Sequence, residues 1–287
     1  MRRSKVREAI TFSRFAAFTT GLTLSLVMLG IYTAATGSGL ACSAQWPLCD
    51  NGLLPQTIPS FVEWFHRLVA MVTGWFILGT AVWSWRRTDR RAKVTATLAV
   101  VLLPLQISIG AVTVTLNGLL PSGYSAPTQG AHLVVALAIF SLLVWTTLSA
   151  RPETSPSLGG VQRALSIALG ALGVAALTSR VVTSIPYSPA AQAVFYGAAL
   201  IAVAALLAAT RWLADSAVSW LRFATGSALA LLFVGMLLGR DLVFYTPTVR
   251  LFNAAVFLLA GGAVVVASVL SRRAHTDGTT GSTVRTR

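Results

Sequence analysis

The sequence predicts an all-α integral membrane protein with eight transmembrane helices, arranged as two pseudo-repeated four-helix bundles. Of its 287 residues, 55% are hydrophobic and 10% are charged, whereas soluble domains carry about 25% charged residues. The mean hydropathy is +0.74. Apolar runs of about 20 residues, which is the length that crosses the hydrocarbon core of a bilayer, recur eight times. They lie near 14–35, 60–85, 93–116, 127–149, 161–183, 190–213, 218–239 and 248–270.

The distribution of Lys and Arg predicts that both termini are cytoplasmic. Basic residues gather before the first run, between the second and third, and after the eighth, whereas the segments 36–59 and 117–126 contain none. Cytoplasmic loops carry the excess of basic residues in membrane proteins. Arg180, Arg240 and Arg250 are exceptions at the outer ends of helices. We therefore expect a multi-pass protein of a prokaryotic cell membrane, in contact with lipid.

Two other interpretations of the basic residues are disfavoured. The formal net charge is +14, but the basic residues are scattered between apolar runs, so that we do not expect nucleic-acid binding. The basic N-terminus with its first apolar run resembles a signal peptide. That run is long for a signal, and cleavage would leave seven helices, so we expect the first helix to be retained.

Weak internal similarity predicts a duplication. The segment 127–132 aligns without a gap with 247–252, and 59–67 aligns with 189–197. These offsets divide the chain into an N-terminal half, 1–150, that carries the candidate site and a degenerate C-terminal half, 151–273. The Thr-, Gly- and Ser-rich tail, 274–287, is expected to be disordered and cytoplasmic.

Two histidines inside apolar runs are the main candidate ligands, while His275 falls in the tail. Ionisable residues within a span are costly and usually functional. At 1.5 Å per residue, His66 lies about 9 Å and His132 about 7–8 Å from the same outer face. Imidazoles at matched depth on two helices of one bundle favour a bis-histidine haem site, with one axial nitrogen from each side.

Two alternatives stay open for this pair. The histidines could instead make interhelical hydrogen bonds, or bind zinc with Glu63 as a third ligand, although zinc takes three or four protein ligands. Glu63 precedes His66 by one helical turn. It is either a buried partner of Arg67 or a proton carrier beside a haem, and Arg67 is a candidate for binding a haem propionate.

Cys42 and Cys49 lie in the first outer loop, on the oxidising side of a prokaryotic membrane. A disulfide that closes a short ring and holds the loop over the site is favoured over an exchangeable thiol pair. Gly30 and Gly110 are expected to mark close helix packing rather than contact with a cofactor.

Several of these motifs together resemble the haem A synthase family. They are Gly37-Ser38-Gly39-Leu40-Ala41-Cys42, Trp46-Pro47-Leu48-Cys49, Glu63-Trp64-Phe65-His66-Arg67, Gly110-Ala111-Val112-Thr113-Val114 and Gln129-Gly130-Ala131-His132-Leu133. The resemblance implies an enzyme that oxidises the C8 methyl of haem O to a formyl group, giving haem A for terminal oxidases. It also implies that His66 and His132 are the axial ligands of the substrate haem, that Glu63 is the acidic residue beside it, and that Cys42 and Cys49 are the paired cysteines.

The C-terminal half departs from the family, in which each half holds one haem between two histidines. On our alignment Tyr196 stands in place of His66, Phe252 in place of His132, and Ala193 in place of Glu63. Phe cannot ligate iron, so a second haem is doubtful. We therefore predict an oxidising enzyme with one haem of the O or b type, and keep a non-enzymatic b-type haem protein, an electron carrier or a haem-delivery partner of the oxidase, as the alternative. A transporter is disfavoured, because no Gly- or Pro-broken helix pair marks a midplane site.

Two partners follow from this prediction. One is a supplier of haem O, the haem O synthase, and the other is a terminal oxidase under assembly. The sequence leaves a homo-oligomer open.

Overall fold

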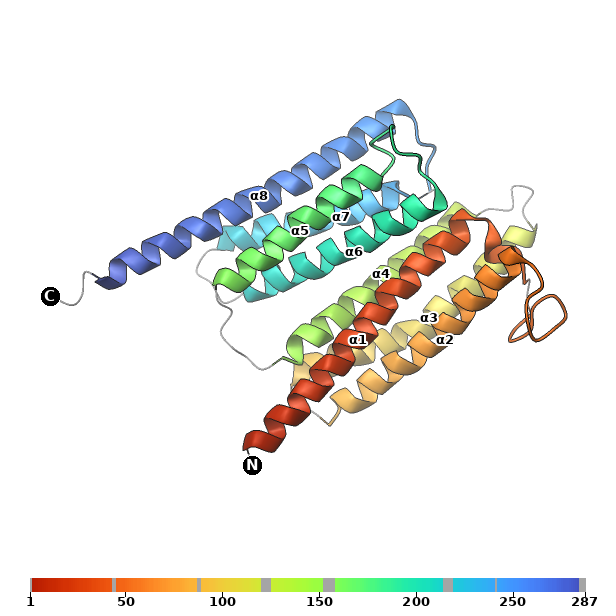
Figure 1. Cartoon of the computed structure of the whole chain (residues 1–287), viewed down its shortest axis with the longest axis horizontal. Coiled ribbons are helices and arrows are strands. Elements are labelled where there is room, and N and C mark those ends of the chain that lie inside the picture. The colour runs from red at the N-terminus through yellow and green to blue at the C-terminus, as the bar shows by residue number, and fades with distance from the viewer. Residues whose placement is uncertain are drawn as a thin grey trace. The chain divides into compact units, whose positions relative to one another are not determined.

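The computed structural model describes residues 2–42, 45–86, 89–119, 125–151, 158–213, 219–240 and 242–283 (Figure 1). Its elements are α1 (Arg2–Ala35), the short 3₁₀ helix η1 (Ser38–Leu40), α2 (Ile58–Ser84), α3 (Arg90–Leu119), α4 (Ala126–Ser149), α5 (Leu158–Thr178), α6 (Pro189–Trp212), α7 (Ser219–Leu238) and α8 (Pro247–Thr283). The described residues contain no β-strand, apart from one isolated bridge between Cys49 and Gly52.

The predicted all-α membrane fold is confirmed, because eight helices are long and apolar enough to cross a bilayer. The spans agree with the expected ones to within a few residues, with one exception. The fifth apolar run was expected to stay helical to residue 183, but α5 ends at Thr178. The Ser179 hydroxyl bonds to the Ala176 carbonyl and accepts the Val181 N–H, so the chain turns there.

Residues 274–287 were expected to form a disordered tail. α8 as assigned continues to Thr283, while residues 284–287 lie outside the described part of the chain. The orientation in the membrane, the pseudo-repeat and the disorder of the tail stay predictions.

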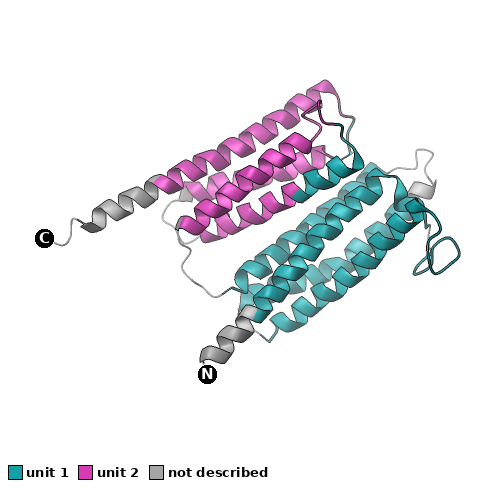
Figure 2. Cartoon of the chain, in the orientation of Figure 1, with its two compact units in different colours: residues 1–152, 186–197, 240–244 teal, residues 153–185, 198–239, 245–287 magenta. Residues whose placement is uncertain are grey.

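The chain forms two compact units (Figure 2). The first contains residues 1–152 together with two segments of the C-terminal half, 186–197 and 240–244. The second contains 153–185, 198–239 and 245–287, in which α8 packs on α5 and α7. The first turns of α6 and the segment after α7 therefore belong with the candidate site, although the sequence places both in the other half.

The first unit is a four-helix bundle in which α1 neighbours α2 and α4, and α3 also neighbours α2 and α4. The helices α2 and α4 therefore stand diagonally across the bundle. The element η1 contacts α1, α2 and α3, and so covers one end of it. We call this the loop end, where α1 finishes and α2 and α4 begin (Figure 1).

Hydroxyl pairs tie these helices together. Thr19 on α1 bonds to Thr80 on α2 (3.0 Å), Thr20 bonds to Thr147 on α4 (2.9 Å), and Thr95 on α3 bonds to Thr146 (2.8 Å). In lipid no hydrophobic force drives helices together, and such hydrogen bonds contribute about 1 kcal/mol each. The three bonds fix the positions of the helices relative to one another in the half of the bundle far from the loop end. The candidate functional side chains lie in the other half, near the loop end.

The segment 186–197 packs against α1 in the same unit. A Cβ built on Gly197 would lie 2.7 Å from Sδ of Met28, so a larger residue there would require the Met28 side chain to move. The neighbouring rings of Phe195 and Tyr196 are fully buried and meet edge to face, with centroids 4.8 Å apart. This packing fixes the outer turns of α6 to the bundle.

Candidate functional site

His66 lies on α2, two turns from its start, with its ring against a glycine of α1. The Cε1 atom of His66 is 3.0 Å from the position that a Cβ on Gly30 would occupy. The ring is half-buried, and its Nδ1 atom is buried with no hydrogen-bond partner. The absence of a side chain at Gly30 therefore creates the space in which the imidazole sits.

His132 has the matching arrangement on α4, where its ring lies against a glycine of α3. Its Cε1 atom is 3.2 Å from the Cβ position of Gly110, and its Nδ1 atom is also buried without a partner. Its Nε2 atom lies 3.3 Å from Nε2 of Gln106, whose own Oε1 is buried and unpartnered. Gly30 and Gly110 were expected to serve helix packing alone, but both lie against the ring of a candidate ligand.

The two histidines belong to the diagonal helices α2 and α4 and lie close to the loop end. Buried polar atoms without partners are rare in folded proteins and call for a ligand, a water or a strained state. Two imidazoles from opposite helices, held by glycines and with unpartnered nitrogens, fit a haem iron with two axial histidines.

Glu63 is engaged by the loop rather than by the histidines. Its side chain is 2% exposed; Oε2 accepts the backbone N–H of Cys42 (2.6 Å) and Oε1 pairs with Arg67. Arg67 also donates to the backbone carbonyl of Gln45 (2.7 Å). Among the described residues, no group of three His, Cys, Asp or Glu side chains is placed to hold a metal ion. Glu63 is thus not combined with His66 and His132 as the zinc alternative would require.

Cys42 and Cys49 form a disulfide, with Cα atoms 4.8 Å apart. Both cysteines are buried against the start of α2. Three more bonds hold the loop there: the Trp64 indole N–H donates to the Pro47 carbonyl (3.1 Å), the Ser60 hydroxyl donates to Asp50 (2.9 Å), and the Gln56 N–H donates to Asp50 (2.8 Å). The disulfide loop is therefore a fixed cap on the helix that carries His66.

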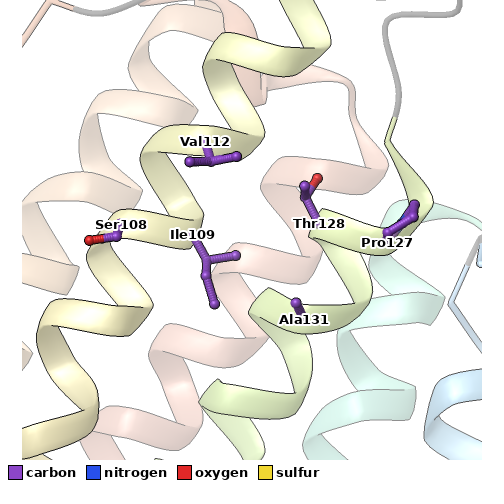
Figure 3. Close-up of a pocket in the computed structure, with 6 residues that line it drawn as sticks. All are labelled: Ser108, Ile109, Val112, Pro127, Thr128 and Ala131. Carbon is purple, nitrogen blue, oxygen red and sulfur yellow. The ribbon is translucent and has the colours of Figure 1, made fainter.

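A small groove lies between α3 and α4 at the loop end, with a volume of about 270 Å³ (Figure 3). The side chains of Ser108, Ile109 and Val112 line it from α3, and those of Pro127, Thr128 and Ala131 from α4. Ile109 and Ala131 directly precede Gly110 and His132 in the sequence. The groove provides mainly apolar surface beside the His132 part of the site.

A buried arginine joins the loop end from the C-terminal half. Arg240 is 4% exposed, and its Nη2 donates to Oε1 of Gln129 on α4 (3.0 Å). In the sequence, Arg240 stands out only as an exception to the charge distribution. The sequence feature that could have pointed to it is an Arg at the expected outer end of a span, where basic residues are uncommon.

The positions that replace histidines in the C-terminal half have different environments. Tyr196 is fully buried in the first unit, whereas Phe252 is 56% exposed on α8 in the second. Ala193 is half-buried on α6. None of these side chains is a usual haem ligand on its own.

Comparisons with known proteins agree with the geometry of the N-terminal half. The family model described as cytochrome oxidase assembly protein matches residues 13–179. The heme A synthase of Bacillus licheniformis is 34% identical over 133 residues, which cover 45% of this chain and 42% of that protein. The heme A synthase of Bacillus pumilus is 31% identical over 137 residues, or 46% of this chain and 43% of that protein.

A protoheme IX farnesyltransferase of Halobacterium salinarum is 38% identical over 139 residues, or 46% of this chain and 30% of that protein. The chain thus matches less than half of the length of each of these relatives. The family model, in contrast, covers more than half of the chain. The protein therefore belongs to the cytochrome oxidase assembly protein family, which includes the heme A synthases.

Proposed function

We propose that the protein is a haem-oxidising enzyme of the haem A synthase type, which converts the C8 methyl of haem O into a formyl group. The observation that carries the proposal is the pair of imidazoles on diagonal helices, each seated on a glycine of a neighbouring helix. Relatives named heme A synthase support the reaction. The relatives named protoheme IX farnesyltransferase act by name on a haem precursor, which supports the substrate class.

In this proposal His66 and His132 would hold the haem iron. Gly30 and Gly110 limit how far each imidazole can move toward its neighbouring helix, and so orient the two rings. Gln106 contacts the Nε2 atom of His132. When haem binds, Gln106 would give up this contact, so that Nε2 of His132 could bind the iron. The iron porphyrin supplies the redox chemistry when bound, while the chain supplies binding, orientation and proton handling.

Conversion of a methyl into a formyl group, –CH3 + H2O → –CHO + 4 H⁺ + 4 e⁻, takes up the oxygen of one water, releases four protons and passes four electrons to an external acceptor. Glu63 is the acidic residue nearest in sequence to His66, one helical turn away, and we assign it the role of accepting a proton from the reaction. Its bonds to Arg67 and to the Cys42 N–H hold the side chain at the loop end. Proton uptake at Glu63 would weaken the ion pair with Arg67, which couples the proton step to the loop.

The alternative is a non-enzymatic b-type haem protein that carries electrons or delivers haem to an oxidase. It is favoured by the side chains of the C-terminal half, where Tyr196 and Phe252 replace the expected histidines. A haem enzyme without a second haem needs its electrons to leave by another route. The Glu63–Arg67 pair and the disulfide cap count against a simple carrier, because they build a specific acidic group beside the haem site.

The proposal includes two partners and a location. A haem O synthase would supply the substrate, and a terminal oxidase would receive the product. The protein would lie in a prokaryotic cell membrane with both termini in the cytoplasm, so that the loop end faces outward.

The decisive experiment analyses the haem extracted from the protein purified after expression with a haem O source. The pyridine haemochrome spectrum and the mass of the haem are measured for the wild type and for His66→Ala. Haem A or its hydroxylated precursor in the wild type, lost in His66→Ala, is the expected result. Unmodified haem in the wild type would favour the carrier, and no bound haem would overturn both functions.

A further inference from the structure

Arg240 is a buried cation at the loop end of the first unit. Its one side-chain bond is to the neutral amide of Gln129, and no Asp or Glu of the described residues pairs with it. A guanidinium has five N–H donors, arranged as a fork that suits two parallel bonds to a carboxylate. A buried charge is normally paired, because its desolvation costs several kcal/mol. None of the described residues supplies the anion that would pair with this guanidinium.

The segment that carries Arg240 is fixed on the first turn of α4. The Leu242 side chain packs against Gly130 of α4. Its Cδ1 atom lies 3.4 Å from the position that a Cβ on Gly130 would occupy. The Leu242 N–H bonds back to the Arg240 carbonyl (2.7 Å), which closes a tight turn. Gln129 and Gly130 thus contact this segment at neighbouring positions of α4: Gly130 contacts Leu242, and Gln129 binds the Arg240 guanidinium.

This anchor places Arg240 next to a candidate haem ligand. Gln129, which holds Arg240, and His132 are three residues apart on α4 and share a helix face. Arg67, the other basic residue at the loop end, is engaged by Glu63 and by the Gln45 carbonyl. Among the described residues, only Arg67 of these two arginines has a carboxylate partner.

We propose that Arg240 binds a propionate carboxylate of the haem held by His66 and His132, with Gln129 holding the guanidinium in place. The proposal rests on the proposed function and gives the C-terminal half a role in the site, although that half lacks histidines. It also transfers the propionate contact from Arg67, where the sequence predicted it, to Arg240. A guanidinium suits this task because it binds a carboxylate with two bonds of fixed direction.

The test compares two haems on the full-length purified protein. Protohaem and its dimethyl ester, in which both propionates are blocked, are titrated by the Soret band into the wild type, Arg240→Gln, Arg240→Lys and Arg250→Gln. Arg250 is exposed on α8, so Arg250→Gln is a control with the same change of charge. A charged hydrogen-bond pair contributes enough for about a tenfold change in affinity.

We expect Arg240→Gln to bind protohaem about tenfold more weakly than the wild type, and Arg240→Lys to lie between them. The affinity of the wild type for the diester should be lower than its affinity for protohaem by a similar factor. Arg240→Gln should bind protohaem and the diester with equal affinity. An equal loss of both haems in Arg240→Gln would overturn the contact and show a structural role. Asp241, the next residue, lies outside the described part of the chain. The comparison of protohaem with its diester separates a contact of Arg240 with a propionate from an ion pair of Arg240 within the chain.

The outcomes also distinguish this proposal from the proposed function. A wild type that binds neither haem overturns both. A wild type that binds haem through His66 and His132, with Arg240→Gln unchanged, overturns only the role of Arg240. The thermal midpoint of each variant, measured without haem, shows whether the variant is folded.

Discussion

The Cε1 atom of His66 lies 3.0 Å from the point where a Cβ on Gly30 would stand. His132 has the same relationship with Gly110, at 3.2 Å. Real Cβ atoms rarely approach a ring this closely, so alanine at either position would push the imidazole by a few tenths of an ångström. A binding site needs its ligands within about 0.5 Å of the productive geometry. The two glycines therefore belong to the site as positioning residues.

The first prediction concerns these glycines. Gly30→Ala and Gly110→Ala should each weaken haem binding about tenfold, because overpacking costs about 1–3 kcal/mol. Soret titration measures the affinity, and electron paramagnetic resonance reports whether both axial histidines stay bound. Gly21→Ala, on the same helix as Gly30, is the control, because no atom lies within 4 Å of its Cβ position. Alanine is the better helix former by about 1 kcal/mol, so Gly21→Ala should keep haem affinity. Wild-type affinity in Gly30→Ala would contradict the positioning role.

The second prediction concerns the ligands themselves. His66→Ala and His132→Ala should each convert six-coordinate, low-spin haem into a five-coordinate, high-spin form, because one axial nitrogen is lost. Optical and electron paramagnetic resonance spectra measure the change. Added imidazole should restore the low-spin spectrum in each variant, since the space against the glycine is left empty. If both single variants kept the wild-type spectrum, the histidines would not be the ligands.

Most of the fold could be predicted from the sequence, because a membrane span is recorded locally in length and hydropathy. The end of α5 could not, since apolar residues continue past Thr178 and the turn at Ser179 depends on its own hydroxyl bonds. The two histidines stood out because polar groups are rare in spans. Gln106 carried the same signal, as an amide in the apolar run of α3, and was overlooked.

The supporting residues of the site depend on contacts between distant segments. Nothing in the sequence near Gly30 shows that a ring from α2 lies against it. Likewise, the bond from Arg240 to Gln129 joins residues 111 positions apart. The positions of such residues depend on how helices pair, and one sequence does not contain that pairing.

The third prediction separates two roles of Glu63. Glu63→Ala should keep haem bound and block oxidation of the methyl if the carboxylate accepts a proton. Glu63→Ala and Glu63→Gln both also break the ion pair with Arg67. Each should lower the free energy of unfolding by about 2–3 kcal/mol, because a buried charged hydrogen bond is lost. Haem content, haem A yield and thermal midpoint are measured together. Normal haem A yield from Glu63→Gln would leave Glu63 with only its role in holding the loop.

The fourth prediction concerns the disulfide cap. The loop from Cys42 to Cys49 closes a short ring, for which chain entropy gives a stabilisation of about 2.5 kcal/mol. Cys42→Ser with Cys49→Ser should lower the thermal midpoint and expose residues 45–57 to proteases. Limited proteolysis with mass analysis checks this, with the reduced wild type as a second sample. Because the Cys42 N–H also bonds to Glu63, we expect slower haem oxidation as well. Equal protease resistance in reduced and oxidised protein would show that the other loop bonds suffice.

The fifth prediction concerns the number of haems. The chain should bind about one haem, because Tyr196 is fully buried against Phe195 and Phe252 has no ligating atom. The ratio of haem to protein follows from the pyridine haemochrome and quantitative amino-acid analysis. Tyr196→Phe removes the only oxygen that this position offers to iron, and should leave the ratio unchanged, whereas His132→Ala should reduce it. Two haems per chain in the wild type, with one lost in Tyr196→Phe, would show that tyrosine serves as an iron ligand. In that case electrons could pass between two haems in one chain. A ratio of one instead requires an electron acceptor that reaches the haem between His66 and His132 from outside.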